Sequence, residues 1–310
     1  MKHTSLIVIA AAVVAMFFPS LFEWVRGTTQ TTILGIIMLG MGVTLSANDF
    51  RILASRPLDI LIGTCAQYSL MPLIAITVSS LLCLDTPLMI GIVLVGCCPG
   101  GVSSNIMSFL CKGDVAFSVG MTTASTLLSP LLTPLLVLLL AGEQVDVDTI
   151  GMFQGILIVT IIPVALGFGL NMLSAKSSRM NTIIAPVKRL MPAVSVVGLA
   201  LIVGGVVATV RPYIIDGGLS LLGITFFAVL FHNGLGYALG YLTGSLFHFS
   251  TAKKRTISIE VGMQNAGLAT NLASQFFLAS NPLAVVPCAI SCAWHSISGT
   301  LIAQWFCRND

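Results

Sequence analysis

The sequence predicts an all-α, multi-pass membrane protein with ten transmembrane helices. Of its 310 residues, 56% are hydrophobic and 8% are charged, whereas roughly 25% of a typical soluble domain is charged. Apolar runs of spanning length recur along the whole chain, and about 20 apolar residues suffice to cross a bilayer. The basic residues also gather on one side when these runs are threaded back and forth. The length alone would suggest about two soluble domains, but no soluble core needs this much apolar sequence.

Ten apolar segments follow one another with short connections and no soluble domain. They cover roughly residues 5–22, 32–48, 58–82, 87–111, 115–141, 150–173, 191–210, 219–246, 256–280 and 283–306. The first resembles a signal peptide, with Lys2 before an apolar run. No small-x-small cleavage pattern follows it, so we expect a retained first helix. The longest polar loop is expected at Ser174–Leu190.

Charge predicts the orientation of these segments. With the N-terminus in the cytoplasm, all 14 Lys and Arg residues except Arg26 and Arg211 lie on the cytoplasmic side. Both termini and the Ser174–Leu190 loop are then cytoplasmic, and Glu143–Asp148 is external. Topology explains the basic loops better than a nucleic-acid patch does, so no nucleic-acid partner is expected. None of the 8 cysteines forms a CxxC pair, which indicates neither zinc nor a disulfide framework.

The acidic loop Glu143–Asp148 divides the chain into two units of five spans, residues 1–145 and 146–310. Because five is odd, the two units must insert with opposite orientations. This arrangement predicts an inverted repeat, which is a common plan of secondary transporters.

Two interrupted helices occupy matching positions in these units. The fourth span of the first unit carries GCCPGGVSSN, Gly96 to Asn105, and the fourth span of the second carries EVGMQNAG, Glu260 to Gly267. Pro99 removes a backbone donor, and glycines relax the backbone. Either interruption alone would be a simple kink. Their matched positions predict a transporter site instead.

The directions of the two interrupted spans predict what they bind. The first runs from outside to inside and the second from inside to outside, so two half-helix C-termini and two N-termini meet at the centre. The C-terminal ends suit a cation and the N-terminal ends an anion. Ser103 or Ser104 is expected to cap one second half-helix, and Asn265 the other.

Glu260 is the one acidic residue that falls inside an expected span, away from loops and helix ends. The other 10 of the 11 acidic residues fall in such places. A charge in the bilayer costs ~2.5–3.5 kcal/mol or more and marks a functional site by default. The alternative is that Glu260 snorkels to water, but Lys253, Lys254 and Arg255 already mark the water boundary one to two turns earlier.

Other polar residues inside the spans have two interpretations each. Ser118 and Thr122 are four residues apart and share a helix face, while Gln67 lies mid-span. Alternatively, all three side chains form hydrogen bonds between neighbouring helices. His232 and His295 are mid-span too, where a buried neutral histidine bonded to a neighbour is the simpler interpretation. The glycine series 234, 236, 240 and 244 favours close helix packing.

Several motifs together resemble the bile acid:sodium symporter family, particularly its bacterial members, over nearly the whole chain. They are GCCPGGVSSN, KGDVAFSV, TLLSPLLTP, HNGLGY, IEVGMQNAGLA and WHSISG. The resemblance implies that spans 1, 2, 6 and 7 form a panel domain. Spans 3–5 and 8–10 then form a core domain in which discontinuous spans 4 and 9 cross. It also implies a location in the bacterial inner membrane.

The resemblance implies two sodium sites that share Glu260. The matching positions of the first are Ser104, Asn105, Ser118, Thr122 and Glu260. Those of the second are Gln67, Glu260, Gln264 and the backbone carbonyls of Val261 and Met263. All are oxygen donors, which a hard cation requires. No cofactor is implied beyond two sodium ions as coupling ions.

The resemblance places an organic anion at the half-helix ends, with Val102, Ser103, Asn265, Gly267 and His295 as contact positions. Related symporters often carry GGTASN where this chain has GGVSSN, so Val102 has lost a hydroxyl and Ser103 has gained one.

The expected function is therefore a symporter and not an enzyme, importing one monovalent anion with two sodium ions by alternating access. The substrate would be a bile-acid-like steroid or a small carboxylate such as pantoate. The lipid bilayer is its environment, and no obligate protein partner is implied. Two alternatives stay open: an ion or proton channel, and a membrane-embedded enzyme using Glu260 with His232 or His295 as an acid–base pair.

Overall fold

The computed structural model describes residues 4–308, which fold almost entirely into helices. Lys2 and Asp310, which the charge analysis assigns to the cytoplasmic side, lie outside the described residues. Two groups of helices form the molecule. The first helix group comprises α1 (Thr4–Phe17), α2 (Thr28–Thr44), α8 (Thr149–Ile156), η2 (Leu157–Ile161), α9 (Ile162–Lys176) and the part of α10 (Ser178–Leu246) before Gly218.

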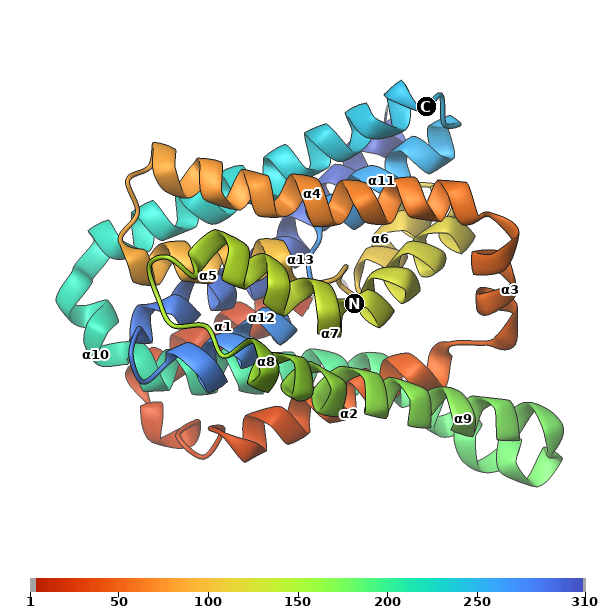
Figure 1. The fold of residues 1–310 in the computed structure, drawn as a ribbon. Helices are drawn as coiled ribbons and strands as arrows, with labels where there is room; N and C mark the ends of the chain where they lie inside the picture. Colours follow the sequence, from red (N-terminus) through yellow and green to blue (C-terminus); the bar gives the residue numbers. More distant parts are fainter. Residues whose placement is uncertain (1–3, 309–310) are drawn as a thin grey trace.

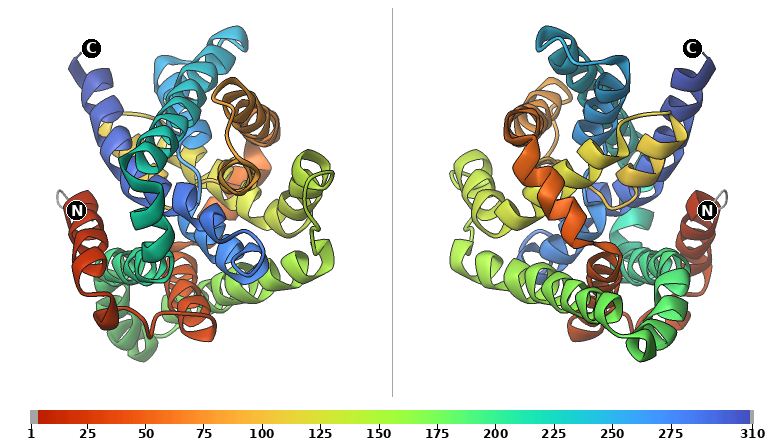
Figure 2. Two further views of the ribbon diagram at one scale, coloured as in Figure 1. Left: turned by 90° about the vertical axis from the view of Figure 1, so that its left-hand side faces the viewer. Right: turned by 90° about the vertical axis from the view of Figure 1, so that its right-hand side faces the viewer.

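The second helix group holds the interrupted helices. It comprises α4 (Pro57–Leu81), α5 (Thr86–Cys97), α6 (Ser104–Leu110), α7 (Val115–Ala141), the part of α10 after Gly218, α11 (Thr251–Gly262), α12 (Ala266–Leu272), η3 (Ala273–Phe277) and α13 (Val285–Arg308). Two 3-10 turns complete the described chain, η1 (Pro19–Leu21) and η4 (Pro282–Ala284). In Figure 1 the first group lies below the second, and α3 (Ala47–Ser55) joins them at one end. Helices α1 and α13 pack against each other, so both ends of the chain lie on one flank (Figure 2).

Membrane-length helices account for much of the chain. Within residues 4–308, five helices are long and apolar enough to cross a membrane, and three shorter apolar helices accompany them. The longest, α10, bends at Gly218, which has φ 60°. Positive φ is accessible to glycine at little cost. The expected segments 191–210 and 219–246 are the two arms of this bent helix. These features are those of a multi-pass membrane protein.

The expected polar loop Ser174–Leu190 is wrong. Helix α9 continues to Lys176 and α10 begins at Ser178, so the connection is a tight turn at Ser177, whose side chain accepts a hydrogen bond from the backbone N–H of Met180. Polar and basic residues end an apolar segment, but they do not end a helix. Both helices therefore continue beyond the apolar segments that hydropathy identifies.

Helix α3 was not predicted, because it is too short and too polar to read as a span. Its N-terminus carries a capping box: Ser46 accepts from the N–H of Asp49, and the Asp49 carboxylate accepts from the N–H of Ser46 at 2.7 Å. The ring of Phe50 packs on Phe168 of α9 with centroids 4.8 Å apart. Helix α3 thus packs along α7 of the second helix group, and its Phe50 ring links it to α9 of the first.

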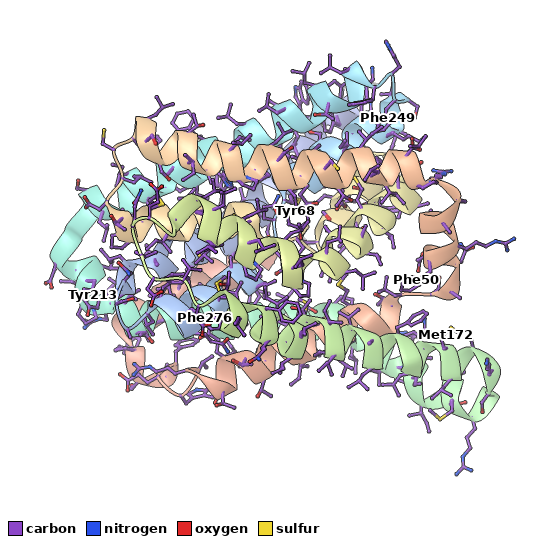
Figure 3. All side chains as sticks on the ribbon, in the orientation of Figure 1. Phe50, Tyr68, Met172, Tyr213, Phe249 and Phe276 are labelled. Atoms are coloured by element: carbon purple, nitrogen blue, oxygen red, sulfur yellow. The ribbon has the colours of Figure 1, made fainter. Side chains whose placement is uncertain are left out.

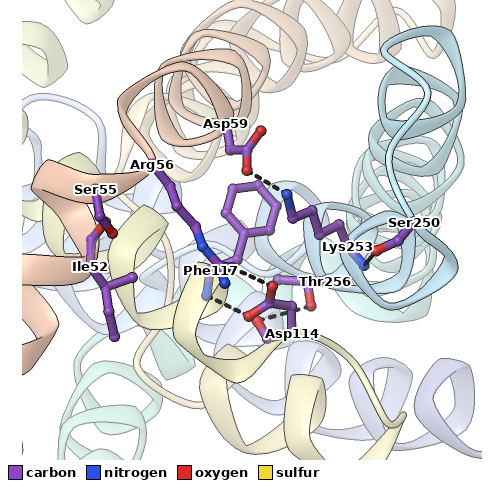
Figure 4. Close-up of polar contacts among 9 residues, drawn as sticks. All are labelled: Ile52, Ser55, Arg56, Asp59, Asp114, Phe117, Ser250, Lys253 and Thr256. Carbon is purple, nitrogen blue, oxygen red and sulfur yellow. Dashed lines mark hydrogen bonds and ion pairs between the residues drawn. The ribbon is translucent and has the colours of Figure 1, made fainter.

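Two ion pairs tie together the starts of three helices in the second group (Figure 4). Arg56, just before α4, pairs with Asp114, just before α7, at 2.7 Å. Lys253 of α11 pairs with Asp59 of α4 at 2.5 Å. The same end of the molecule carries the labelled Phe249 and Phe50 in Figure 3, and Tyr213 lies at the opposite end. The basic residues at this end are therefore partly neutralised by acids on neighbouring helices.

Polar contacts also join the two helix groups along one stretch of their boundary, here called the seam. Thr31 Oγ1 of α2 accepts from Gln275 Nε2 at 2.6 Å and from Asn271 Nδ2 at 3.3 Å. Gln30 Nε2 donates to Ser274 Oγ at 3.2 Å. Phe276 packs over the glycines of α8, since a Cβ added at Gly151 would lie 3.0 Å from its ring. All four residues on the α12–η3 side lie within a stretch of six, and η3 is a π-helical segment.

Candidate functional site

The two interrupted helices are joined to each other through their backbones. Helix α5 ends at Cys97 and α6 begins at Ser104, while α11 ends at Gly262 and α12 begins at Ala266. The helices are therefore interrupted where the Pro and Gly motifs predict. The residues that follow the first halves, Cys98 and Met263, are extended (ψ 160° and 97°). Extended backbone exposes N–H and C=O groups that need partners.

Those groups find their partners across the crossing. Gly100 and Gln264 form an antiparallel β-bridge. Gly101 N–H donates to the Met263 carbonyl, and Asn265 N–H donates to the Pro99 carbonyl, each at 2.8 Å. Pro99 lacks an N–H to donate, so its carbonyl is the group that the partner strand satisfies. The two breaks therefore form a single structural unit.

Glu260 lies beside this unit and is fully buried. Its Oε1 accepts hydrogen bonds from Ser104 Oγ at 2.6 Å and from Ser118 Oγ, and its Oε2 accepts from Thr122 Oγ1 at 2.8 Å. Ser118 and Thr122 contribute from one face of α7, as their spacing predicts, and Ser104 starts α6. No basic side chain is among these bonded partners. Hydroxyl dipoles thus stabilise the carboxylate, and its negative charge is left to attract a cation.

Asn105 belongs to the same cluster. Its Oδ1 accepts from Ser118 Oγ at 2.8 Å and from Thr122 Oγ1 at 3.4 Å. The five positions Ser104, Asn105, Ser118, Thr122 and Glu260 therefore lie together, with their oxygen atoms facing one another. Carboxylate, amide and hydroxyl oxygens are hard ligands that suit a hard cation. Among the described residues, no group of three or more His, Cys, Asp or Glu gathers as transition-metal ligands.

The two glutamines of the second predicted set are bonded to each other. Gln67 Nε2 of α4 donates to Gln264 Oε1 at 3.2 Å, and Gln264 Nε2 donates to the Val261 carbonyl at 2.6 Å. The Met263 carbonyl already accepts from Gly101. The Oε1 atom of Gln67 is buried and has no hydrogen-bond partner among the described residues. A buried unpaired acceptor is costly, and a cation would relieve that cost.

Gly100 lies where the two sets approach each other. A Cβ added at this position would lie 3.1 Å from Glu260 Oε2 and 3.5 Å from Gln67 Nε2. Its N–H donates to Ser125 Oγ at 3.2 Å. The missing side chain therefore keeps open the space between the Glu260 carboxylate and the Gln67 amide.

The caps of the second half-helices agree only in part with expectation. Asn265 caps α12, because its side chain accepts from Leu268 N–H at 3.0 Å. Ser103 stands at the N-cap position of α6 but makes no capping hydrogen bond. Ser104 Oγ instead donates to Glu260 and to the Gly101 carbonyl at 2.6 Å. The predicted serine cap is wrong: Ser103 has helical backbone angles and makes no cap bond, and Ser104 is already the first residue of α6.

The positions assigned to substrate surround the crossing. Val102 and Ser103 are partly exposed in the α5–α6 connection, and Asn265 and Gly267 lie at the start of α12. A Cβ at Gly267 would lie 3.6 Å from Leu199 of α10 in the first helix group. Gly267 therefore lies near the boundary of the two helix groups.

Both mid-span histidines are buried and bonded to backbone. His295 Nδ1 lies 3.2 Å from the Gln264 carbonyl oxygen, and its Nε2 has no partner among the described residues. His232 Nε2 lies 3.1 Å from the Met71 carbonyl oxygen. His232 thus follows the simpler interpretation, while His295 keeps a free ring nitrogen next to the crossing.

Sequence reasoning missed three residues that hold the broken ends in place. Thr133 Oγ1 donates to the carbonyl of Cys97, the last residue of α5, at 2.7 Å. Asn233 Nδ2 donates to the carbonyl of Gly262, the last residue of α11, at 2.6 Å. Ser125 accepts from Gly100. The motifs TLLSPLLTP and HNGLGY contain Thr133 and Asn233, but only the packing of the helices shows that these side chains reach the breaks.

Comparison with known proteins gives consistent matches. The model of the family described as "Sodium Bile acid symporter family" matches residues 31–216. The chain is 42% identical over 302 residues to the "Uncharacterized sodium-dependent transporter YocS" of Bacillus subtilis (strain 168), covering 97% of this chain and 90% of that protein. It is 39% identical over 296 residues to the "Probable sodium/metabolite cotransporter BASS1, chloroplastic" of Oryza sativa subsp. japonica, and 40% identical over 293 residues to the protein of the same name from Arabidopsis thaliana. These matches cover 96% and 94% of this chain and 70% of each relative.

Proposed function

The chain belongs to the sodium bile acid symporter family, and from this premise we propose that it imports one monovalent organic anion together with two sodium ions. It is a sodium-dependent solute cotransporter of that family and not an enzyme. The observation that carries the proposal of sodium-coupled anion import is the buried Glu260 carboxylate, bonded by three hydroxyls beside the crossing of two broken helices.

The two ligand sets are the sodium sites of this proposal. The first consists of Ser104, Asn105, Ser118, Thr122 and Glu260. The second consists of Gln67, Glu260, Gln264 and the carbonyls of Val261 and Met263. Each carbonyl oxygen has two lone pairs, so a carbonyl that accepts one hydrogen bond retains a second position for a cation. Both assignments are supported by the shared carboxylate and by the buried Gln67 Oε1, which has no partner in the described part of the chain.

Charge balance supports an anionic substrate. Glu260 contributes one negative charge and two sodium ions contribute two positive charges, which leaves one positive charge. The N-termini of α6 and α12 add positive potential at the crossing. One monovalent anion brings the sum to zero. Sodium therefore raises the affinity for the anion, and the anion raises the affinity for sodium by the same factor.

The anion binds between the half-helix ends and the first helix group. Val102, Ser103, Asn265, Gly267 and His295 are its contact positions, and the substrate is a bile-acid-like steroid or a small carboxylate such as pantoate. The names of the chloroplast relatives speak of sodium/metabolite cotransport, which supports a metabolite-sized anion. The first helix group acts as the panel domain, and the second acts as the core domain. Residues 1–145 and 146–310 are the inverted repeats, and both termini face the cytoplasm of a bacterial cell.

Uptake into proteoliposomes tests the proposal. Purified protein would be reconstituted with sodium chloride or choline chloride outside, and uptake of labelled taurocholate and labelled pantoate would be measured. We expect concentrative uptake of one of them in sodium only. A negative interior should accelerate it, since one charge crossing 100 mV is worth about 2.3 kcal/mol.

Two results would contradict the proposal in different ways. Uptake that persists unchanged in choline would remove sodium coupling. Sodium-driven uptake that ignores voltage would leave symport in place but exclude two sodium ions per monovalent anion.

A further inference from the structure

We propose that Asn233 is a positioning residue that fixes the carbonyl groups at the end of α11 in the geometry that binds sodium. This inference rests on the proposed function, because Val261 and Met263 enter the second sodium site through their carbonyls. Gly262, whose carbonyl Asn233 holds, lies between them in the chain.

The end of α11 needs such a support. The last carbonyls of a helix have no N–H partner within the helix, so their orientation depends on partners from elsewhere. Here the fully buried Asn233 donates its amide to the Gly262 carbonyl at 2.6 Å. The Val261 and Met263 carbonyls belong to the peptide groups on either side. Fixing the central peptide therefore limits the rotation of both neighbours.

Helix α10 holds the same end of α11 at further points. A Cβ added at Gly236 would lie 3.0 Å from Gly262 Cα, so the two backbones are in close contact. The ring of Tyr237 packs over the Cα of Gly262, and the Tyr237 carbonyl accepts from Ser258 Oγ at 2.7 Å. Asn233 is the member of this contact whose side chain bonds to the terminal carbonyl. Its neighbours bring the two helices close enough for that bond.

The other broken helix provides an internal control. Thr133 of α7 bonds to the terminal carbonyl of α5, that of Cys97, at 2.7 Å in the same manner. Cys97 contributes no ligand to either proposed sodium site. Loss of the Thr133 bond should therefore disturb a broken helix while changing sodium affinity far less than loss of the Asn233 bond does.

The test measures sodium binding by thermal stability, so no substrate has to be known. Purified protein would be melted in increasing sodium chloride, with choline chloride holding the ionic strength constant. Asn233→Leu keeps the shape and removes the donor. We expect the sodium concentration for half-maximal stabilisation to rise about tenfold, which corresponds to 1.4 kcal/mol. Thr133→Val should leave it within twofold of the wild-type value.

The outcomes separate this inference from the proposed function. If sodium fails to stabilise even the wild-type protein, the proposed function itself is wrong. If sodium stabilises wild type and Asn233→Leu at the same concentration, only the positioning role is wrong. Equal shifts in Asn233→Leu and Thr133→Val would show a general loosening of the crossing and would also overturn it. Should Asn233→Leu not fold, Asn233→Ser decides, because its hydroxyl is too short to reach Gly262 and the same tenfold rise is expected.

Discussion

Among the described residues, the hydrogen-bond partners of Glu260 are hydroxyl groups, although it is a fully buried carboxylate. Hydroxyl groups can turn. The oxygen that donates to Glu260 in this structure can present its lone pairs to a cation that arrives beside the carboxylate. A lysine or arginine in the same place would have neutralised Glu260 permanently. The three hydroxyls therefore stabilise the buried carboxylate in the folded protein and leave its charge available to a cation.

Replacing Glu260 by Gln tests that charge directly. The amide keeps the shape and an acceptor for the hydroxyls but removes the negative charge, so sodium-driven uptake should fall at least 100-fold. Stability in sodium-free buffer should be unchanged or higher, because a buried charge is costly. Uptake assays and thermal melting measure the two effects. Glu143→Gln, at an exposed residue between α7 and α8, is the control and should transport normally. Full uptake by Glu260→Gln would refute the role.

Gly100 gives a second prediction at this scale. In Gly100→Ala the new methyl group would lie 3.1 Å from Glu260 Oε2, inside the space between the proposed sodium sites. We expect at least a tenfold rise in the sodium concentration for half-maximal uptake. Gly234→Ala is the matched control, since no atom lies within 4 Å of its added Cβ. It should behave as wild type or be more stable by about 0.5–1 kcal/mol, as for glycine in a helix interior. Similar sodium curves for the two variants would contradict this account of Gly100.

At the scale of elements, the crossing depends on two helices that end early and resume. Proline and glycine interrupt α5, and extended residues follow both first halves, so the exposed backbone groups pair across the break. Neither break would be satisfied without the other. Hydrocarbon tolerates unpaired backbone groups poorly, which is why such breaks occur inside protein rather than against lipid.

The direction in which these elements cross the membrane is testable by labelling. Single cysteines would replace Gln144, between α7 and α8, and Ser177, between α9 and α10, in a chain whose native cysteines are removed. Both positions are exposed. A membrane-impermeant maleimide should label Gln144→Cys in intact cells and Ser177→Cys only after permeabilisation, because basic residues flank the second turn. Labelling of both from the same side would exclude the inverted repeat.

The sequence predicts those features of the site that depend on local chemistry. Pro99 and the glycines mark the first break, Asn265 is a good cap, and the spacing of Ser118 and Thr122 places both on one face. Thr133 and Asn233 could not be predicted, because their role depends on which helix lies against each broken end. The loop expected at Ser174–Leu190 failed for a different reason. Hydropathy registers where the membrane ends, and a helix can continue past that point into water.

For the molecule as a whole, the seam is where the two helix groups meet through polar contacts. Thr31, Gln30 and the glycine face of α8 receive side chains from the segment Asn271–Phe276. Part of this segment is π-helical, a rare geometry that often marks functional positions. Hydrogen bonds of this kind contribute only about 0.5–1.5 kcal/mol each. The seam is thus specific but weak enough to open during a transport cycle.

Cross-linking the seam tests whether it opens. Cysteines would replace Thr31 and Gln275, whose side chains are 2.6 Å apart, and a short reducible bis-thiol reagent would join them. Uptake should fall by more than tenfold and return after reduction. As a control, the same reagent would join cysteines at Asp59 and Lys253, which lie together within the second helix group. That link should leave uptake intact. Undiminished uptake with a fully cross-linked seam would show that the helix groups need not separate there.

The backbone bridge between Gly100 and Gln264 also constrains how the protein is made. More than half of the chain is synthesised between these two residues. Until the second is synthesised, Gly101 N–H and the Pro99 carbonyl lack the partners that they have in the finished structure. The break between α5 and α6 is therefore completed only after α11 and the residues that follow it have been synthesised.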